Sequence, residues 1–154
     1  TRMRIEEGEP SGDEEKDFSS MLSAFKQGIE KTVAEEDFQT HYDLGVAFKE
    51  MGLLDEAIGE FQKALRAPEG KLKSSEALGT AFFEKEQYNV AETILKRAVE
   101  NIEAGEQEKL GLWYWLGRAC EAQQKVADAQ NAYHHVTAVN MKFLDTADRV
   151  KALA

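Results

Sequence analysis

The segment GVAFKEMGLLDEAIGEFQKAL, residues 45–65, decides the fold of this chain. It holds two runs of apolar residues at helical spacing, and Gly52 lies between them. Glycine is a poor residue for the interior of a helix, and it adopts the positive φ of a tight turn at no steric cost. The segment is therefore predicted to form two short helices joined by a turn.

The same pattern returns twice further along the chain, each time starting from a glycine that follows a leucine. These glycines are Gly45, Gly79 and Gly117, which lie 34 and then 38 residues apart. After each glycine come an alanine at the twelfth position and a large residue at the sixteenth, namely Ala57 and Phe61, Ala91 and Leu95, and Ala129 and Tyr133. A fixed period of this size indicates a repeat array. Three helix pairs are predicted, over about residues 38–51 and 55–67, 71–86 and 89–103, and 107–123 and 127–139.

The predicted turns within the three pairs place Gly52, Glu86 and Gln124 at matching positions. A positive φ is expected there, which glycine accepts readily and the two longer side chains accept less comfortably. Asp55 and Asn89 are predicted to be N-caps of the helices that follow, because short polar side chains bond the free N–H groups of a first turn.

These residues resemble the tetratricopeptide repeat family, whose pattern reads W-x2-L-G-x2-Y, then A-x3-F, then P. The first copy reads His41-x2-Leu44-Gly45-x2-Phe48, then Ala57-x3-Phe61, then Pro68; the second reads Ser75-x2-Leu78-Gly79-x2-Phe82, then Ala91-x3-Leu95; the third reads Trp113-x2-Leu116-Gly117-x2-Cys120, then Ala129-x3-Tyr133. The family favours a large aromatic residue where this chain has His41 and Ser75. The resemblance implies an all-α, right-handed superhelical stack of antiparallel helix pairs, with a concave side lined by the first helix of each pair.

Four regions are predicted along the chain. Residues 1–16 are rich in acidic residues and hold Gly, Pro and Ser, which is typical of a flexible linker or tail. Residues 17–36 are predicted to form an amphipathic helix, because Phe18, Met21, Leu22, Phe25, Ile29 and Val33 share one face. It either caps the array or docks elsewhere. The repeats are expected over residues 37–140, at about 38–70, 71–106 and 107–140, and a C-terminal capping helix over 141–154. Because the chain opens on Thr1, we expect it to be a fragment of a longer protein.

The sequence offers no candidates for catalysis, cofactor binding or metal binding. It lacks a phosphate-binding loop and a nucleophile motif, and Cys120 falls at a packing position. His134 and His135 are neighbours on one helix and point about 100° apart, so they are poor partners for one metal ion. The net charge of −10 argues against nucleic-acid binding. No apolar run is long enough to span a membrane, and a cytoplasmic protein that is not an enzyme is expected.

The predicted concave face is where a partner is expected to bind. Its residues are Tyr42, Val46, Lys49, Glu50, Lys73, Glu76, Thr80, Phe83, Glu84, Tyr114, Arg118 and Glu121. Exposed aromatic residues among mixed charges that nearly cancel are typical of a peptide-binding groove. The prediction is an adaptor or scaffold that holds a peptide or helix of another protein by apolar and aromatic anchors. Phe83 and Tyr114 have a second interpretation, in which they pack against the next repeat.

The family resemblance also implies which partners to test. Members that bind the acidic C-termini of large chaperones carry a clamp of Lys, Asn, Asn, Lys and Arg. The corresponding residues of this chain are Tyr42, Val46, Ala77, Gly111 and Trp115, so a chaperone C-terminal carboxylate is not the expected ligand. The alternative function is self-association into a homodimer, through helix 17–35 or through the concave face.

Overall fold

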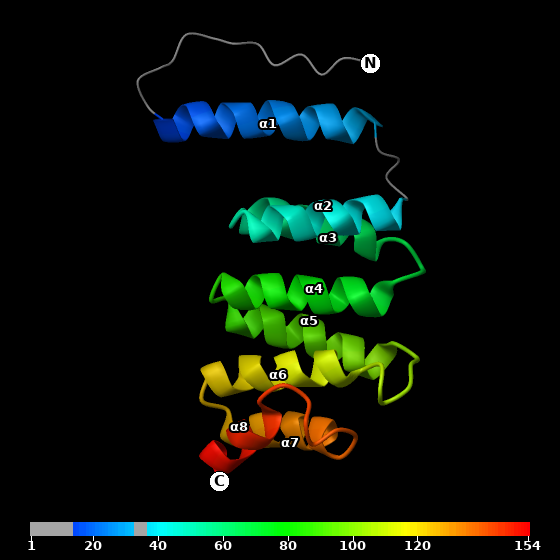
Figure 1. Cartoon of the computed structure of the whole chain (residues 1–154), viewed down its shortest axis with the longest axis vertical. Helices are drawn as coiled ribbons and strands as arrows, with labels where there is room; N and C mark the ends of the chain where they lie inside the picture. The colour runs from blue at the N-terminus through cyan, green and yellow to red at the C-terminus, as the bar shows by residue number, and fades with distance from the viewer. Residues whose placement is uncertain (1–13, 33–36) are drawn as a thin grey trace. The chain divides into compact units, whose positions relative to one another are not determined.

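A computed structural model describes residues 14–32 and 37–154, and these residues form helices and connecting turns without a β-strand (Figure 1). The chain divides between Asp37 and Phe38 into two units. The first contains α1 (Glu14–Thr32). The second contains α2 (Phe38–Glu50), α3 (Leu54–Leu65), α4 (Lys71–Glu84), α5 (Tyr88–Asn101), α6 (Leu110–Ala122), α7 (Val126–Thr137) and α8 (Thr146–Leu153). None of the helices in the described ranges is both long and apolar enough to cross a membrane.

Helix α1 is amphipathic, and it begins three residues before the expected position. Glu14, Glu15 and Asp17 lie in its first turn, where the helix dipole favours negative charge. Residues 14–16 are therefore helical and do not belong to the predicted tail. The remaining predicted tail residues and Val33 of the predicted helix lie outside the described residues.

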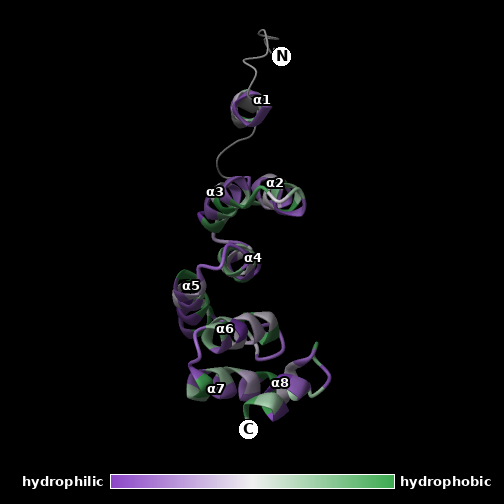
Figure 2. Ribbon diagram, turned by 90° about the vertical axis from the view of Figure 1, so that its left-hand side faces the viewer, coloured by the Kyte–Doolittle hydropathy of each residue, from purple (hydrophilic) through white to green (hydrophobic). Residues whose placement is uncertain are grey.

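The second unit is a stack of helix pairs. Helix α2 packs against α3, α4 against α5, and α6 against α7, and each pair also contacts the next pair in chain order. Helices α2 to α7 follow one another down Figure 1, and Figure 2 shows the second helices α3 and α5 beside the first helices α2 and α4. The first helices α2 and α4, and α4 and α6, also touch directly. They form a continuous surface along one side of the stack.

Small residues let the two helices of each pair approach closely. Ala57, Ala91 and Ala129 are fully buried. A Cβ atom added to Gly45, Gly79 or Gly117 would collide with Phe61, Leu95 or Tyr133 respectively. Each repeat thus closes a gap between two helices with one large residue from the second helix.

The predicted turn geometry is confirmed. The φ angle is +79° at Gly52, +63° at Glu86 and +61° at Gln124. The predicted N-caps are wrong, because α3 and α5 begin one residue before Asp55 and Asn89. Asp55 instead lies in the first turn of α3, where its charge still suits the helix dipole.

Two helix boundaries near the C-terminus differ from the expected ones. Helix α6 begins at Leu110, not at residue 107. The terminal helix covers residues 146–153 only, because Leu144 has a φ of +47° that no helix continues through. The hydroxyl of the fully buried Thr146 donates to the backbone carbonyl of Phe143 at 2.7 Å and fixes this bend.

One polar pair is buried within the first repeat. His41 Nδ1 lies 2.7 Å from Glu60 Oε2, and their side chains are 3% and 2% exposed. The other carboxylate oxygen of Glu60 lies 3.5 Å from the ammonium group of Lys63. His41 thus occupies the packing position where the sequence pattern favours an aromatic residue, and its ring nitrogen also provides a hydrogen-bond partner for the buried Glu60 side chain.

Candidate functional site

A hollow of about 430 Å³ opens on the surface formed by the first helices α2, α4 and α6. Its lining residues are Tyr42, Val46, Lys49, Glu50, Phe61, Glu76, Ala77, Thr80, Glu84 and Trp115. Only Phe61 comes from a second helix, and it is fully buried. We refer to this cavity as the hollow.

The hollow brings together most of the predicted concave-face residues of the first two repeats. They are Tyr42, Val46, Lys49, Glu50, Glu76, Thr80 and Glu84. Lys73 does not line it, and its ammonium group lies 4.2 Å from the ring centroid of Tyr42. Thr80 is 7% exposed, and its hydroxyl donates to the backbone carbonyl of Glu76 at 2.7 Å.

Ala77 and Trp115 line the hollow but were not among the predicted site residues. Both stand two positions before the repeat glycine. This shared position in the repeat is the sequence signal that identifies them.

The predicted residues of the third repeat do not line the hollow, and two of them, Tyr114 and Glu121, are engaged by residues 141–154, the C-terminal segment. Tyr114 is 3% exposed, and its ring centroid lies 5.9 Å from that of Phe143. Its hydroxyl donates to Asp145 Oδ1 at 2.6 Å and accepts from Arg118 at 3.1 Å. The expectation of an exposed Tyr114 ring is wrong. The packing interpretation is right for this residue, with the C-terminal segment in place of a further repeat.

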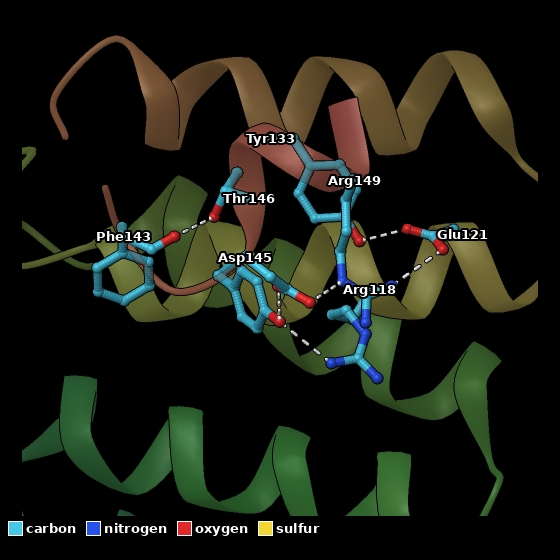
Figure 3. Close-up of polar contacts among 8 residues, drawn as sticks. Arg118, Glu121, Tyr133, Phe143, Asp145, Thr146 and Arg149 are labelled. Atoms are coloured by element: carbon cyan, nitrogen blue, oxygen red, sulfur yellow. Dashed lines mark hydrogen bonds and ion pairs between the residues drawn. The ribbon is translucent and has the colours of Figure 1, made fainter. Parts of the chain in front are cut away.

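Glu121 is also engaged by the C-terminal segment. The Arg149 side chain bridges Glu121 Oε2, at 3.1 Å, and Asp145 Oδ2, at 3.0 Å (Figure 3). The hydroxyl of Tyr133 donates to Glu121 Oε1 at 2.7 Å. Glu121 therefore fastens α8 to α6 and α7.

The hydrogen bond from Tyr114 is the main cause that holds the pKa of Asp145 below its usual range.

Phe83 and Arg118 form a second layer beside the hollow. The Phe83 ring meets the rings of Tyr88 and Trp115 edge-on, with centroids 5.1 and 5.4 Å away. The guanidinium of Arg118 lies 5.0 Å from the Phe83 centroid and 5.3 Å from that of Trp115. Through these cation–π contacts, the Arg118 guanidinium supports the position of the Trp115 ring.

Replacing Tyr114 with phenylalanine is expected to lower the free energy of unfolding by about 1–2 kcal/mol, because the change removes hydrogen bonds to two charged side chains. Chemical denaturation followed by circular dichroism measures the loss. Tyr88→Phe is the matched control, since no hydrogen bond of the Tyr88 hydroxyl is found among the described residues. An equal effect of both changes would show that the contact with Asp145 does not hold the C-terminal segment.

The hollow itself is acidic. It contains Glu50, Glu76 and Glu84 but a single cation, Lys49, whose ammonium group is already paired with Glu84 at 3.4 Å. Burial raises the pKa of Glu76, although the charge of Lys49 acts in the opposite direction. The near neutrality expected of the whole concave face does not extend to the hollow, because Lys73 and Arg118 do not line it.

Neither the thiol nor the metal-ligating side chains of the described residues form a second site. Cys120 is 3% exposed, and burial raises the pKa of its thiol to about 11, which keeps the thiol protonated. Within residues 14–32 and 37–154, no group of His, Cys, Asp and Glu side chains is arranged to hold a metal ion.

Comparisons with known proteins agree on the fold. Two models of the tetratricopeptide repeat match residues 38–70 and 76–133. The first TPR of Spaghetti (RPAP3) bound to the HSP90 peptide SRMEEVD superposes with a TM-score of 0.69 at 20% identity, over 79% of this chain and 95% of that one. The first TPR domain of human RPAP3 gives 0.68 at 19% identity, over 78% and 91%. The MamA crystal structure gives 0.69 at 19% identity, over 90% and 78%.

None of the curated proteins compared with the chain matches it. At about 20% identity, the likeness to these solved structures is a likeness of fold. The predicted fold class, an all-α, right-handed superhelical stack of antiparallel helix pairs, is confirmed.

Proposed function

Because this chain belongs to the tetratricopeptide repeat family, we propose that it is a non-enzymatic interaction module that holds a peptide or helix of a partner protein in the hollow. The observation that supports this function is the hollow itself, where three first helices surround one cavity lined by Tyr42 and Trp115. Aromatic side chains in such cavities are the usual anchors of a protein interface. An adaptor or scaffold role follows from a module of this kind.

The predicted site residues take three different roles in this proposal. Residues that line the hollow contact the partner directly, and Lys73, whose ammonium group lies over the Tyr42 ring, contacts it beside the hollow. Phe83 and Arg118 hold Trp115 in place. Tyr114 and Glu121 act indirectly, because they fasten the C-terminal segment that closes the third repeat.

The size of the hollow indicates how much of a partner it takes. A volume of about 430 Å³ lies at the lower end of typical ligand pockets. It accommodates one or two side chains of a bound segment, and the rest of the segment lies along the surface of α2, α4 and α6. Affinity then depends on a few anchor residues, which is the usual distribution in protein interfaces.

An acidic chaperone tail remains outside the proposed partners. The RPAP3 domain carries the HSP90 peptide SRMEEVD, and its likeness to this chain does not support the exclusion. The exclusion rests on the side chains, because the five positions that correspond to the clamp hold no cation: Tyr42, Val46, Ala77, Gly111 and Trp115. The peptide SRMEEVD is accordingly expected not to bind.

Truncation of Trp115 to alanine is expected to weaken binding at least about tenfold, because a central aromatic anchor typically contributes about 2 kcal/mol or more. The probe is a peptide selected on this chain from a phage-displayed random library, and calorimetry measures its affinity for each variant. Trp113→Ala is the matched control, since the Trp113 ring stacks on His135 with centroids 3.8 Å apart and does not line the hollow.

Thermal melting of both variants separates lost binding from lost folding. Full affinity in a folded Trp115→Ala protein would exclude the hollow as the binding site. Selected peptides that lose affinity equally with the Trp113 variant would indicate a site elsewhere on the stack.

Self-association is the second candidate function, and one observation favours it. Helix α1 exposes Phe18, Met21 and Phe25, at 51%, 57% and 39% of their surface, on one face. Exposed apolar rows of this kind mark helix-pairing surfaces. Light scattering on the whole chain, compared with a Phe18→Glu/Phe25→Glu variant, separates a dimer formed through α1 from a monomer.

A further inference from the structure

We propose that the hollow selects a lysine or arginine side chain of the partner segment, with the charged end at the Glu76 carboxylate and the aliphatic part beside Trp115. This inference rests on the proposed function, because it names the chemistry of the anchor that the same cavity takes. It replaces the purely apolar anchor that the sequence favours with an amphipathic one.

Among the described residues, Glu76 is the partly buried carboxylate of the hollow that lacks a hydrogen-bond or ion-pair partner, whereas Glu50 is exposed and Glu84 is paired with Lys49. Glu76 makes no hydrogen bond or ion pair with any side chain in the described part of the chain. The side chain is nevertheless partly buried, and this burial is the main cause that raises the pKa of Glu76. A partly buried carboxylate without a hydrogen bond costs stability, and an incoming ammonium or guanidinium group would relieve that cost.

Gly111 of α6 provides the space for this carboxylate. A Cβ atom at position 111 would collide with Glu76 Oε1, so any other residue there would push the carboxylate away. Trp115 stands four positions further along α6, and residues at this spacing lie on the same side of a helix about 5–6 Å apart. The carboxylate and the Trp115 ring are therefore neighbours within one cavity.

The charge balance of the hollow favours a cation over an anion. Glu76 and Glu84 stand two helical turns apart on α4, and Glu50 adds a third carboxylate from α2. Lys49, the single cation that lines the hollow, is paired with Glu84 at 3.4 Å, although its charge also acts on Glu76. An acidic segment would bring a fourth negative group into this cavity, whereas a basic side chain reduces its excess negative charge.

The aromatic lining suits the same ligand. The chain already places Lys73 over Tyr42, and Arg118 over Phe83 and Trp115, at centroid distances of 4.2, 5.0 and 5.3 Å. Long basic side chains also pack their aliphatic parts along apolar surface while the charged end reaches a polar partner. A lysine or arginine satisfies Trp115 and Glu76 together, which neither an apolar nor an acidic residue does.

Peptide selection on the whole chain tests the inference. Random peptides displayed on phage are selected on the wild-type chain, on Glu76→Gln and on Glu69→Gln, a matched change on an exposed loop residue outside the hollow. Wild-type and Glu69→Gln proteins are expected to select a basic residue at a fixed position. A synthetic copy with norleucine in place of that residue is expected to bind the wild-type chain about tenfold more weakly. On Glu76→Gln the two peptides are expected to bind equally.

Loss of folding does not explain such a result. Burial raises the pKa of Glu76, so the folded protein holds this proton more tightly than the unfolded chain does. The stability of the fold therefore falls as the pH rises through the acid range in which Glu76 ionises, and glutamine removes this cost at neutral pH. Glu76→Gln is expected to melt no lower than the wild type.

The outcomes separate the two proposals. If selected peptides carry no basic residue, or if Glu76→Gln keeps the preference for it, the basic anchor is wrong. The proposed function then still stands, provided that Trp115→Ala weakens the selected peptides. If no selected peptide depends on Trp115, both proposals fail. Binding of SRMEEVD to the wild-type chain, with the same affinity for Glu76→Gln, would also overturn the preference for a cation.

Discussion

Replacing His41 with phenylalanine is expected to lower the free energy of unfolding by about 3 kcal/mol, although an aromatic residue suits this packing position. The reason lies in Glu60, whose side chain is 2% exposed and meets His41 at 2.7 Å. Phenylalanine fills the space but offers no donor, and it leaves Lys63, 3.5 Å away, as the remaining described partner of the carboxylate. Removing the hydrogen-bond partner of a buried carboxylate leaves that group uncompensated in a dry environment.

A double variant distinguishes this cause from a simple loss of packing. In His41→Phe/Glu60→Leu the buried charge is gone, and both positions carry apolar side chains of similar size. Most of the lost stability is expected to return, because apolar pairs often replace buried ion pairs without cost. Urea denaturation of the wild type, of His41→Phe, of Glu60→Leu and of the double variant gives the coupling free energy between the two positions. Equal stability of His41→Phe and the double variant would mean that the charge of Glu60 is not the source of the loss.

The repeat register and the turns were predictable because they depend on neighbours in sequence. A glycine, an alanine and a large residue recur at fixed spacing, and each must pack against the others in its own pair. The positive φ angles of Glu86 and Gln124 follow from the position of Gly52 in the first turn, since equivalent turns share one geometry. Most residues that line the hollow follow as well, because they occur at regular positions on the first helices, whereas Ala77, Trp115 and Phe61 were not among the predicted site residues.

The C-terminal segment was not predictable in the same way. Its path depends on a bend at Leu144 and on contacts of Asp145 and Arg149 with residues about thirty positions earlier. No regular spacing in the sequence predicts such contacts. They bury Tyr114 and occupy Glu121, so one local bend decides which part of the predicted surface stays open.

The acidic character of the hollow has the same origin. A count of charges over the whole first-helix surface includes cations that the folded chain holds against its own aromatic rings, such as Arg118. Composition therefore describes the surface as a whole, whereas a ligand meets the few groups that remain around the cavity. The place of the Glu76 carboxylate in the hollow depends on Gly111, a residue of a different helix that leaves space for it.

Gly117→Ala is expected to destabilise the protein by about 1–3 kcal/mol, whereas Gly59→Ala is expected to stabilise it by about 0.5–1 kcal/mol. Both glycines lie inside helices, so the intrinsic gain in helix propensity is the same. At Gly59 an added methyl group meets nothing within 4 Å. At Gly117 it would collide with the Tyr133 ring, which is fully buried and is tied by its hydroxyl to Glu121 at 2.7 Å. The ring has no space into which it can retreat.

Gly79→Ala completes the series and links the effect to the partner side chain. The atoms that it would meet belong to the branched end of Leu95, which changes rotamer more easily than a ring held at both ends. Its cost is therefore expected to lie between those of the other two changes. Urea denaturation followed by circular dichroism ranks the three variants. If Gly117→Ala and Gly59→Ala shift stability in the same direction, the close approach of α6 and α7 through Tyr133 is wrong, because helix propensity alone would then account for both results.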